Sequence, residues 1–403
     1  MCAWQPVVWV VSHSLMIYNL FSHYMQIRLT RSRLVRIVLS AIAVVSVLIL
    51  LKVLVLGSYP DFNTYYYGVQ TVMHGGNPYV GIQKDGFAFV YPPPAVLLLF
   101  PFSLLPFSLA GQLFTLASLA CLVGSIWVLF KLLNVRAYSA LGILFVILIC
   151  NFFPVKFTLG MGQVNLILLL LVSLFTYCYS KQRDRLAGVL LGLAFAIKLF
   201  PALLFVYLVL ERRWVIVGAL VATVAASGLV TLFVVPLPID VYFFKTSLPS
   251  LASSWKGDYY NQAVSGWLMR DVSSPWLREV LRAATAGVLV VLSLLFIWRG
   301  RKTAEAKLLG LSIVLTVSLI INSFSWQHHF VWLVPSFLIT TVLVMRHKLG
   351  MKYYVLLGLS YILVAINLKD PNAVPVLLQS HVLYGAILLY AIDVYLLAKK
   401  KLN

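Results

Sequence analysis

Uninterrupted runs of apolar residues recur along almost the whole chain, and many are as long as a bilayer is thick. A hydrocarbon core of about 30 Å is crossed by about 20 helical residues. Unpaired backbone groups are costly in hydrocarbon, so only helices or closed barrels cross it, and continuous rather than alternating runs favour helices. The chain is 62% hydrophobic and 10% charged, too little polar surface for a soluble globule. We therefore predict an all-α polytopic membrane protein whose residues 1–403 form a single domain.

The apolar runs predict about 10–12 transmembrane helices. The candidate spans are residues 34–56, 107–130, 137–154, 163–180, 214–236, 277–298, 308–323, 329–345, 353–367 and 376–397. Residues 186–210 have basic flanks on both sides and are interrupted by Lys198 and Pro201, so we expect two short helices that enter the membrane and return. The preceding residues 1–33 are expected to be a cytoplasmic or interfacial leader, or sequence upstream of a start near Met25.

The distribution of Lys and Arg predicts the orientation in the membrane. They cluster in every second connection and at both ends, namely at residues 28–36, 131–136, 181–185, 212–213, 299–307, 346–352 and 399–401. Because cytoplasmic connections carry the excess of basic residues, both termini are expected in the cytoplasm of a cell-membrane protein. The net charge of +20 therefore reflects membrane topology, and no nucleic-acid partner is expected.

Two long polar connections, residues 57–106 and 237–275, then fall on the non-cytoplasmic side. Connections carry functional residues more often than the elements they join. We therefore expect these two outer loops to be catalytic and the active site to lie on the non-cytoplasmic side.

The first outer loop offers a carboxylate and many aromatic rings. Asp61 directly follows the first span, where a partly desolvated carboxylate could take a proton from an acceptor hydroxyl; the alternative is that it ends a helix in water. Asn77 lies in a Gly-Gly-Asn-Pro turn, and Tyr65 and Tyr91 are among the rings on which a sugar could stack. These rings are also typical of an interfacial aromatic belt.

Amide and basic side chains recur beyond this loop. Gln163 and Asn165 follow a Gly-Met-Gly turn and could bind sugar hydroxyls or cap a helix. In the second outer loop, Asn261 and Gln262 precede Arg270, which could bind a phosphate or form a salt bridge with Asp258 or Asp271.

Trp326, His328 and His329 open a later span from its outer side. Adjacent helical residues point about 100° apart, so one histidine is expected to face a cavity, and the pair lacks the spacing of a helical zinc site. A cavity-facing histidine could bind phosphate or the acceptor, whereas an ordinary interfacial histidine is the alternative. Lys198 is an ionisable group inside apolar sequence and hence a substrate-binding candidate, unless it extends to the headgroups. Lys52 and Lys198 are the ionisable residues expected deep in the runs.

The ordered set of motifs resembles glycosyltransferase family 87, the integral-membrane α-mannosyltransferases that include the α-1,2-mannosyltransferases of phosphatidylinositol mannoside synthesis. The motifs are Asp61 with the tyrosines after it, Gly75-Gly-Asn-Pro-Tyr79, Tyr91-Pro-Pro, Gly162-Gln-Val-Asn165, Lys198-Leu-Phe-Pro201, Glu211-Arg-Arg-Trp214, Asn261-Gln262 through Arg270, and Trp326-Gln-His-His329 with Pro335. The resemblance runs from about residue 57 to 345, and the last two spans match no pattern.

The resemblance implies a C-type glycosyltransferase fold and transfer of mannose from a polyprenyl-phosphate-mannose donor to a lipid-linked glycan acceptor, with inversion. It also implies that Asp61 is the base, that His328 or His329 belongs to the active site, and that no metal or other cofactor is needed. The four cysteines, which lie at scattered positions, suggest neither a metal site nor a disulfide framework.

Two other interpretations remain open at this point. A secondary transporter or flippase would also be all-helical with membrane-embedded charges, but it would place functional ions near the midplane, and we find no internal repeat. An enzyme of the same class could instead transfer arabinofuranose, glucose or another hexose.

Overall fold

The computed structural model describes residues 33–81, 89–199, 202–254, 257–300, 303–368 and 371–399. Residues 1–32 of the predicted leader lie outside this part. Every regular element within it is helical, which confirms the predicted all-α class, and an isolated bridge joins Asn261 to Trp326. The first half contains α2 (Arg33–Leu51), α3 (Val53–Leu56), α4 (Pro60–Met73), α5 (Ala95–Ser103), α6 (Phe107–Leu133), α7 (Ala140–Asn151), α8 (Phe153–Met161), α9 (Asn165–Ser180), α10 (Asp184–Ile197) and α11 (Ala202–Leu210). The second half contains α12 (Trp214–Thr231), α13 (Leu237–Tyr242), the π-helix η1 (Phe243–Ser247), α14 (Leu248–Ser254), α15 (Val264–Asp271), α16 (Pro275–Gly300), α17 (Ala304–Ile321), the 3-10 helix η2 (Gln327–Leu333), α18 (Val334–Arg346), α19 (Met351–Ala365), the short 3-10 turns η3 (Pro371–Ala373) and η4 (Val376–Ser380), and α20 (His381–Ala398).

Within the described residues, seven helices are long and apolar enough to cross a membrane, so the protein is polytopic. An eighth span is formed if α7 and α8, which meet at a 50° bend, cross together. Ten is reached when the shorter apolar helices α9 and α19 cross as well. The predicted spans thus coincide with helices, and the uncertainty in their number comes from these bent and short elements.

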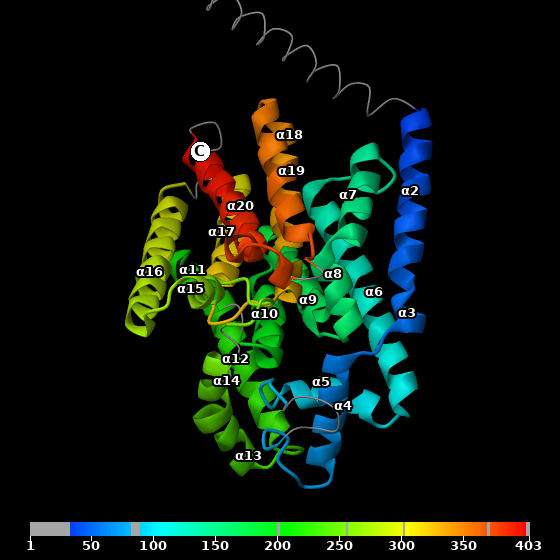
Figure 1. The fold of residues 1–403 in the computed structure, drawn as a ribbon, viewed down its shortest axis with the longest axis vertical. Coiled ribbons are helices and arrows are strands. Elements are labelled where there is room, and N and C mark those ends of the chain that lie inside the picture. Colours follow the sequence, from blue (N-terminus) through cyan, green and yellow to red (C-terminus); the bar gives the residue numbers. More distant parts are fainter. Residues whose placement is uncertain are drawn as a thin grey trace, which may run out of the picture.

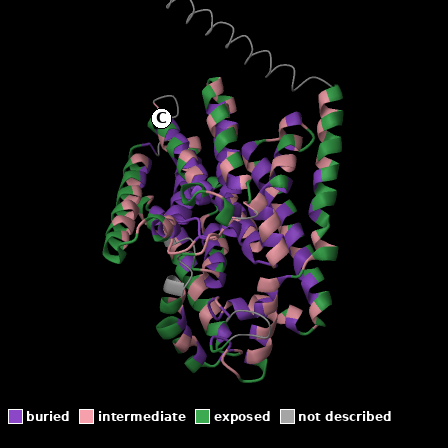
Figure 2. Cartoon of the chain, viewed as in Figure 1, coloured by how far each residue is buried: buried purple, intermediate pink, exposed green. Residues whose placement is uncertain are grey.

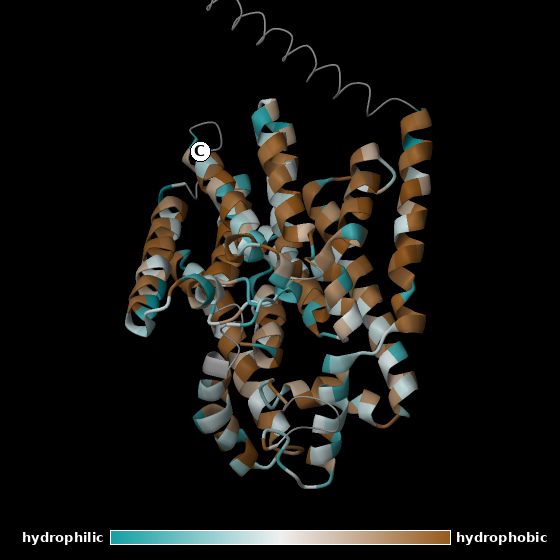
Figure 3. Cartoon of the chain, in the orientation of Figure 1, coloured by the Kyte–Doolittle hydropathy of each residue, from teal (hydrophilic) through white to brown (hydrophobic). Residues whose placement is uncertain are grey.

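The helices form a central core with a lipid-facing periphery (Figure 1). In their most apolar stretches, α17 is 78% buried and η2 with α18 is 89% buried, whereas α2 with α3 and α16 are each 11% buried. Figures 2 and 3 show that α2 and α16 are largely exposed and largely hydrophobic. An exposed apolar helix face is stable when lipid covers it. Paler, more polar segments, including α4, α13 and α14, lie at the opposite end of the molecule from the start of α2.

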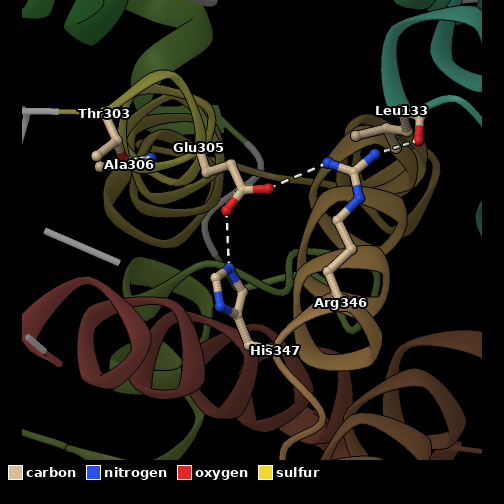
Figure 4. Close-up of polar contacts among 6 residues, drawn as sticks. All are labelled: Leu133, Thr303, Glu305, Ala306, Arg346 and His347. Carbon is tan, nitrogen blue, oxygen red and sulfur yellow. Dashed lines mark hydrogen bonds and ion pairs between the residues drawn. The ribbon is translucent and has the colours of Figure 1, made fainter. Parts of the chain in front are cut away.

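The basic connections gather at one end of the bundle, which we call the basic end. Glu305 at the start of α17 accepts hydrogen bonds from Arg346 and His347 at the end of α18, and Arg346 also donates to the carbonyl of Leu133 at the end of α6 (Figure 4). Thr303 caps α17 beside this cluster by accepting from the Ala306 amide at 3.1 Å. Three helix ends are therefore joined at the basic end.

Helices α10 and α11 form a hairpin whose two ends lie together. Arg213, just before α12, forms an ion pair with Asp184, the first residue of α10. With 14 and 9 residues, the two helices are about 21 and 14 Å long, too short for either to cross a bilayer of about 30 Å. The tip of the hairpin, with Lys198, reaches the interior. The structure thus has the two short helices that the sequence predicts between residues 186 and 210.

The hairpin is held against α12 by close helix packing. A Cβ atom at Gly188 would lie 2.5 Å from the Ile216 carbonyl oxygen, and one at Gly192 would lie 2.7 Å from Thr223 Cβ. Two glycines four residues apart let helix backbones approach closely, which is how helices associate in membranes. The full-length span α12 therefore supports the shorter α10.

An ionisable residue that the sequence analysis missed lies deep in the last helix. Asp393 on α20 is fully buried and accepts hydrogen bonds from Ser312 Oγ on α17 and Thr340 Oγ1 on α18, both at 2.5 Å. The expectation that Lys52 and Lys198 are the ionisable residues deep in the apolar runs is thus wrong. The hydroxyl donors on two neighbouring helices explain how a carboxyl group is accommodated there.

Candidate active site

A cavity of about 400 Å³ lies where the first long connection meets the hairpin tip and η2. Its polar lining includes many of the predicted site residues, namely Asp61, Tyr65, Tyr91, Gln163, Lys198, Trp326, His328 and His329. Thr64, Ser318, Asn322 and Ser323 also line it and were not predicted. Helical spacing from Asp61 would have found Thr64, because residues three and four positions apart share a helix face.

Asp61 lies in the first turn of α4, and a tight turn brings Gln163 beside it. Gly162, between α8 and α9, has φ of 70°, and a Cβ atom there would lie 2.7 Å from Phe62 Cβ. Only glycine combines this left-handed conformation with so close an approach. As a result, the Gln163 side-chain amide donates a hydrogen bond to Asp61 Oδ2.

A directed chain of hydrogen bonds holds the Gln163 amide in place. Tyr91 Oη donates to Gln163 Oε1 at 2.7 Å, so its single proton is used there. Tyr65 Oη, 2.8 Å from Tyr91 Oη, must then be the donor between the two hydroxyls. Both tyrosine side chains are almost fully buried. The chain fixes the orientation in which Gln163 presents its NH₂ group to Asp61.

The protonation of Asp61 reflects its enclosure. Burial raises the pKa of Asp61 from its usual value to about 6, against the opposing effects of the Gln163 hydrogen bond and the Lys198 charge. The carboxyl group is therefore mostly ionised at neutral pH and still basic enough to accept a proton.

Lys198 enters the cavity from the hairpin tip. Its Nζ atom donates to Asn165 Oδ1 at 3.1 Å and lies 2.8 Å from His329 Nε2. The amine also lies 5.3 Å from the Tyr91 ring centre and 5.7 Å from that of Trp332. Burial lowers the pKa of Lys198 to about 7, against the opposing charge of Asp61. Among the described residues, it is the only Lys or Arg in the cavity lining.

Both histidines line the cavity, whereas the α-helical spacing had led us to expect one. The segment is a 3-10 helix, η2, and the two rings meet edge to face at 4.4 Å between centres. His329 Nδ1 accepts a hydrogen bond from the Trp326 backbone amide at 3.2 Å. Trp326 itself stacks on Tyr260 with ring centres 5.7 Å apart.

Several predicted residues lie outside the cavity lining. Asn77 accepts from the Tyr79 amide at 3.0 Å, as in an Asx turn. Asn165 is a buried neighbour of the cavity that bonds to Lys198 and to the His328 carbonyl. The remaining three, Asn261, Gln262 and Arg270, bond to the protein.

Asn261, Gln262 and Arg270 join the second long connection to other segments. Asn261 Oδ1 accepts from the amides of Ala263 and Ser325 at 3.1 and 3.0 Å. Gln262 Nε2 donates to the Gln379 carbonyl at 2.7 Å, and Arg270 donates to the carbonyls of Asp258 and Asn261 and to Ser380 Oγ. These bonds connect the loop to the Trp326–His329 turn and to the segment before α20.

The other wall of the cavity is apolar. It is formed by Leu199 and Leu203 at the hairpin, by Phe243, Leu248 and Leu251 on η1 and α14, by Ile321 at the end of α17 and by Phe324 after it. One cavity therefore combines a carboxylate, an amine with two imidazoles, and a hydrophobic surface.

No three His, Cys, Asp or Glu side chains converge as metal ligands in the part of the chain that the structure describes. Metal independence remains a prediction that chelation can test.

Comparison with known sequences identifies the family. The sequence profile of glycosyltransferase family 87 matches residues 89–323. The chain belongs to glycosyltransferase family 87. The matched range includes Tyr91, Gln163 and Lys198, whereas Asp61 lies before it and His329 after it.

Named relatives come from mycobacteria and corynebacteria. The chain is 31% identical over 61% of its length to a polyprenol-phosphate-mannose-dependent α-(1-2)-phosphatidylinositol pentamannoside mannosyltransferase from Mycolicibacterium smegmatis, and 30% identical over 69% of its length to one from Mycobacterium tuberculosis. It is 28% identical over 60% of its length to an α-(1->3)-arabinofuranosyltransferase from Corynebacterium glutamicum. The alignments span 59%, 65% and 57% of these relatives. No solved structure matches the chain.

Proposed function

We propose that this protein transfers mannose from polyprenyl-phosphate-mannose to a hydroxyl of a lipid-linked glycan, with inversion at the anomeric carbon. The observation that carries the proposal is that the Asp61 carboxylate and the Lys198–His329 pair face the same cavity. An inverting transfer needs a base beside the attacking oxygen and a cationic or hydrogen-bonding group beside the leaving phosphate.

Asp61 is the base in this mechanism. The acceptor oxygen attacks the anomeric carbon as the bond from that carbon to the phosphate oxygen breaks, and the electron pair of the broken bond stays on the polyprenyl phosphate. The acceptor proton passes to Asp61, most directly to Oδ1, because Gln163 occupies Oδ2. A base with a pKa near 6 takes this proton without being protonated beforehand at neutral pH.

Lys198 and His329 are the phosphate-binding groups. The leaving phosphate gains one negative charge as the glycosidic bond breaks. Hydrogen-bond donors and a nearby cation stabilise that charge most strongly in a site shielded from water. Both line the cavity, where His329 is buried and Lys198 is half-buried, so they fit this role.

The apolar wall supports a lipid-linked donor. Leu203 on α11, Leu251 on α14 and Ile321 on α17 line the cavity from three different elements. An isoprenoid chain binds such a surface through burial of apolar area. The names of the mycobacterial relatives, which specify polyprenol-phosphate-mannose, favour the same donor class.

The non-cytoplasmic face is proposed for the reaction because the basic clusters joined at Glu305 and at Asp184 lie at the end of the bundle away from the hairpin tip. The positive-inside rule assigns the basic end to the cytoplasm. Both termini then lie in the cytoplasm of a multi-pass cell-membrane protein.

Arabinofuranose is the second candidate for the transferred sugar. Several relatives named α-(1->3)-arabinofuranosyltransferase are 28% identical to the chain over half of its length or more. Such an enzyme would use the same base and phosphate site, so the sugar is decided by experiment.

The test is transfer of radiolabelled sugar from polyprenyl-phosphate donors to a panel of lipid-linked acceptors by purified protein in lipid. We expect transfer of mannose by the wild type and a loss of about 10²–10⁴-fold in Asp61→Asn, the usual contribution of a general base. Asp271→Asn, at an exposed carboxylate, is the matched control and should retain activity. If the wild type transferred arabinofuranose and no mannose, arabinofuranose would be the substrate sugar. Full activity in Asp61→Asn would show that Asp61 is not the base.

A further inference from the structure

His329 lies between two groups that dictate its protonation. The backbone N–H of Trp326 donates to His329 Nδ1, so this nitrogen carries a lone pair and no hydrogen. A neutral imidazole has one hydrogen, which must then be on Nε2. His329 Nε2 is therefore a donor.

That donor points to Lys198. Nε2 and Nζ are 2.8 Å apart, so a hydrogen bond from Nε2 requires a lone pair on Nζ. An ammonium group has no lone pair, whereas a neutral amine has one and keeps two hydrogens for donation. One of these goes to Asn165 Oδ1. With Lys198 uncharged, the bonds from Trp326 N–H to Nδ1, from Nε2–H to Nζ and from Nζ to Asn165 Oδ1 can all form together.

The charged alternatives break a hydrogen bond. If Lys198 were an ammonium that donates to Nε2, both ring nitrogens of His329 would have to be acceptors, which would leave the imidazole without a hydrogen. If His329 were an imidazolium, Nδ1 would carry a hydrogen and could not accept from the Trp326 amide.

The surroundings of Lys198 agree with an uncharged amine. The titratable groups that face it are Asp61 from α4, Tyr91 from the segment before α5, and His328 and His329 from η2. Asp61 is the only anion among them, and its carboxylate is already bonded to Gln163. A desolvated lysine without a directly bonded carboxylate loses its proton readily.

We propose that Lys198 is a neutral amine in the resting site and takes up one proton when the phosphate of the donor binds. This inference rests on the proposed function only in assuming that a polyprenyl-phosphate sugar occupies the cavity. Once Lys198 is an ammonium, His329 Nε2–H no longer has an acceptor on Nζ and is free to donate to a phosphate oxygen.

Proton uptake prepares the site for the transfer. A phosphodiester donor carries one negative charge, and the product phosphate carries two after bond cleavage. The ammonium is thus present before the second charge develops. The acceptor proton goes separately to Asp61, so the two protons have different destinations. By linkage, donor affinity weakens by up to about tenfold per pH unit wherever the resting amine is neutral.

The experiment is calorimetric titration of the full chain in lipid nanodiscs with polyprenyl-phosphate-mannose, without acceptor, at about pH 8. Two buffers of different ionisation enthalpy give the number of protons bound per donor. We expect about one proton for the wild type and about none for Lys198→Arg, because a guanidinium stays charged. Lys156→Arg, at an outlying lysine bonded to Asn151, is the matched control and should bind one proton.

The outcomes separate this inference from the proposed function. Binding of the donor by the wild type without proton uptake would overturn the inference alone, even if Lys198→Arg fails to fold. Loss of uptake in Asp61→Asn with retention in Lys198→Arg would assign the proton to Asp61 and also overturn it. Binding of another polyprenyl-phosphate sugar in place of the mannose donor, with one proton taken up, would overturn mannose and support the inference. If no polyprenyl-phosphate sugar bound, both the inference and the proposed function would be refuted.

Discussion

The hydrogen bond from Gln163 to Asp61 predicts how the pH dependence of the reaction responds to a single substitution. In Gln163→Leu, the carboxylate loses an amide donor while the cavity keeps a side chain of similar size. The charged form of Asp61 is then less stable, so the pKa of Asp61 rises further. Because the base is active only when ionised, the fall in kcat/KM at low pH should move to higher pH.

The size of the shift follows from the type of bond. A hydrogen bond to a charged group contributes about 1.5–3 kcal/mol, and one pKa unit corresponds to about 1.4 kcal/mol. The pKa of Asp61 should therefore rise from about 6 by about 1–2 units. At pH 7 the ionised fraction would drop from about nine tenths to about half or less, and the loss would be recovered by raising the pH.

The assay is the pH profile of kcat/KM for sugar transfer by wild type, Gln163→Leu and Gln112→Leu, in which Gln112 is exposed on α6. The control should follow the wild type. A loss of activity in Gln163→Leu that is equal at every pH would mean that Gln163 acts only by position. An unchanged pH profile would mean that the fall in kcat/KM at low pH does not come from protonation of Asp61.

Four further predictions concern positioning, packing and metals. Asn261→Leu removes the acceptor of the Ser325 amide next to the Trp326–His329 turn, so kcat should fall by on the order of tenfold with little change in donor KM. Gly192→Val, which places a Cβ atom against Thr223, should lower the free energy of unfolding by about 1–3 kcal/mol and lower the melting temperature. Asp393→Asn can still bond both hydroxyl groups and should melt near the wild type, whereas Asp393→Leu should melt lower. EDTA should leave transfer unchanged, and inhibition reversed by a divalent ion would contradict this.

Much of the fold follows from the sequence because membranes impose simple rules. Span lengths set by the bilayer predict helices that coincide with α2, α6, α12, α16 and α17. The break at Lys198 and the basic residues on both flanks predict the hairpin. The 50° bend between α7 and α8 lies next to Pro154, where the predicted span 137–154 ends, because a proline has no backbone N–H with which to continue the helix.

The sequence predicts only some of the residues of the site, and the reason is physical. Asp61 and Lys198 are costly to bury, so their presence next to or within apolar sequence marks a cavity. Asn261 and Arg270 carry no such signal, since an amide or guanidinium in a loop can bind a ligand or a backbone carbonyl equally well. Their partners include Ser380 in the segment before α20, where the sequence matched no pattern.

The hairpin also determines how the rest of the chain is mapped onto the two compartments. A segment that enters and leaves the membrane on the same side makes no crossing, so the chain continues on the side from which it entered. Counting residues 186–210 as one helix changes the parity, so every later segment, including the loop with Asn261 and the end of the chain, is assigned to the wrong compartment. The Asp184–Arg213 ion pair joins the two ends of the hairpin, as a segment that enters and leaves on the same side requires.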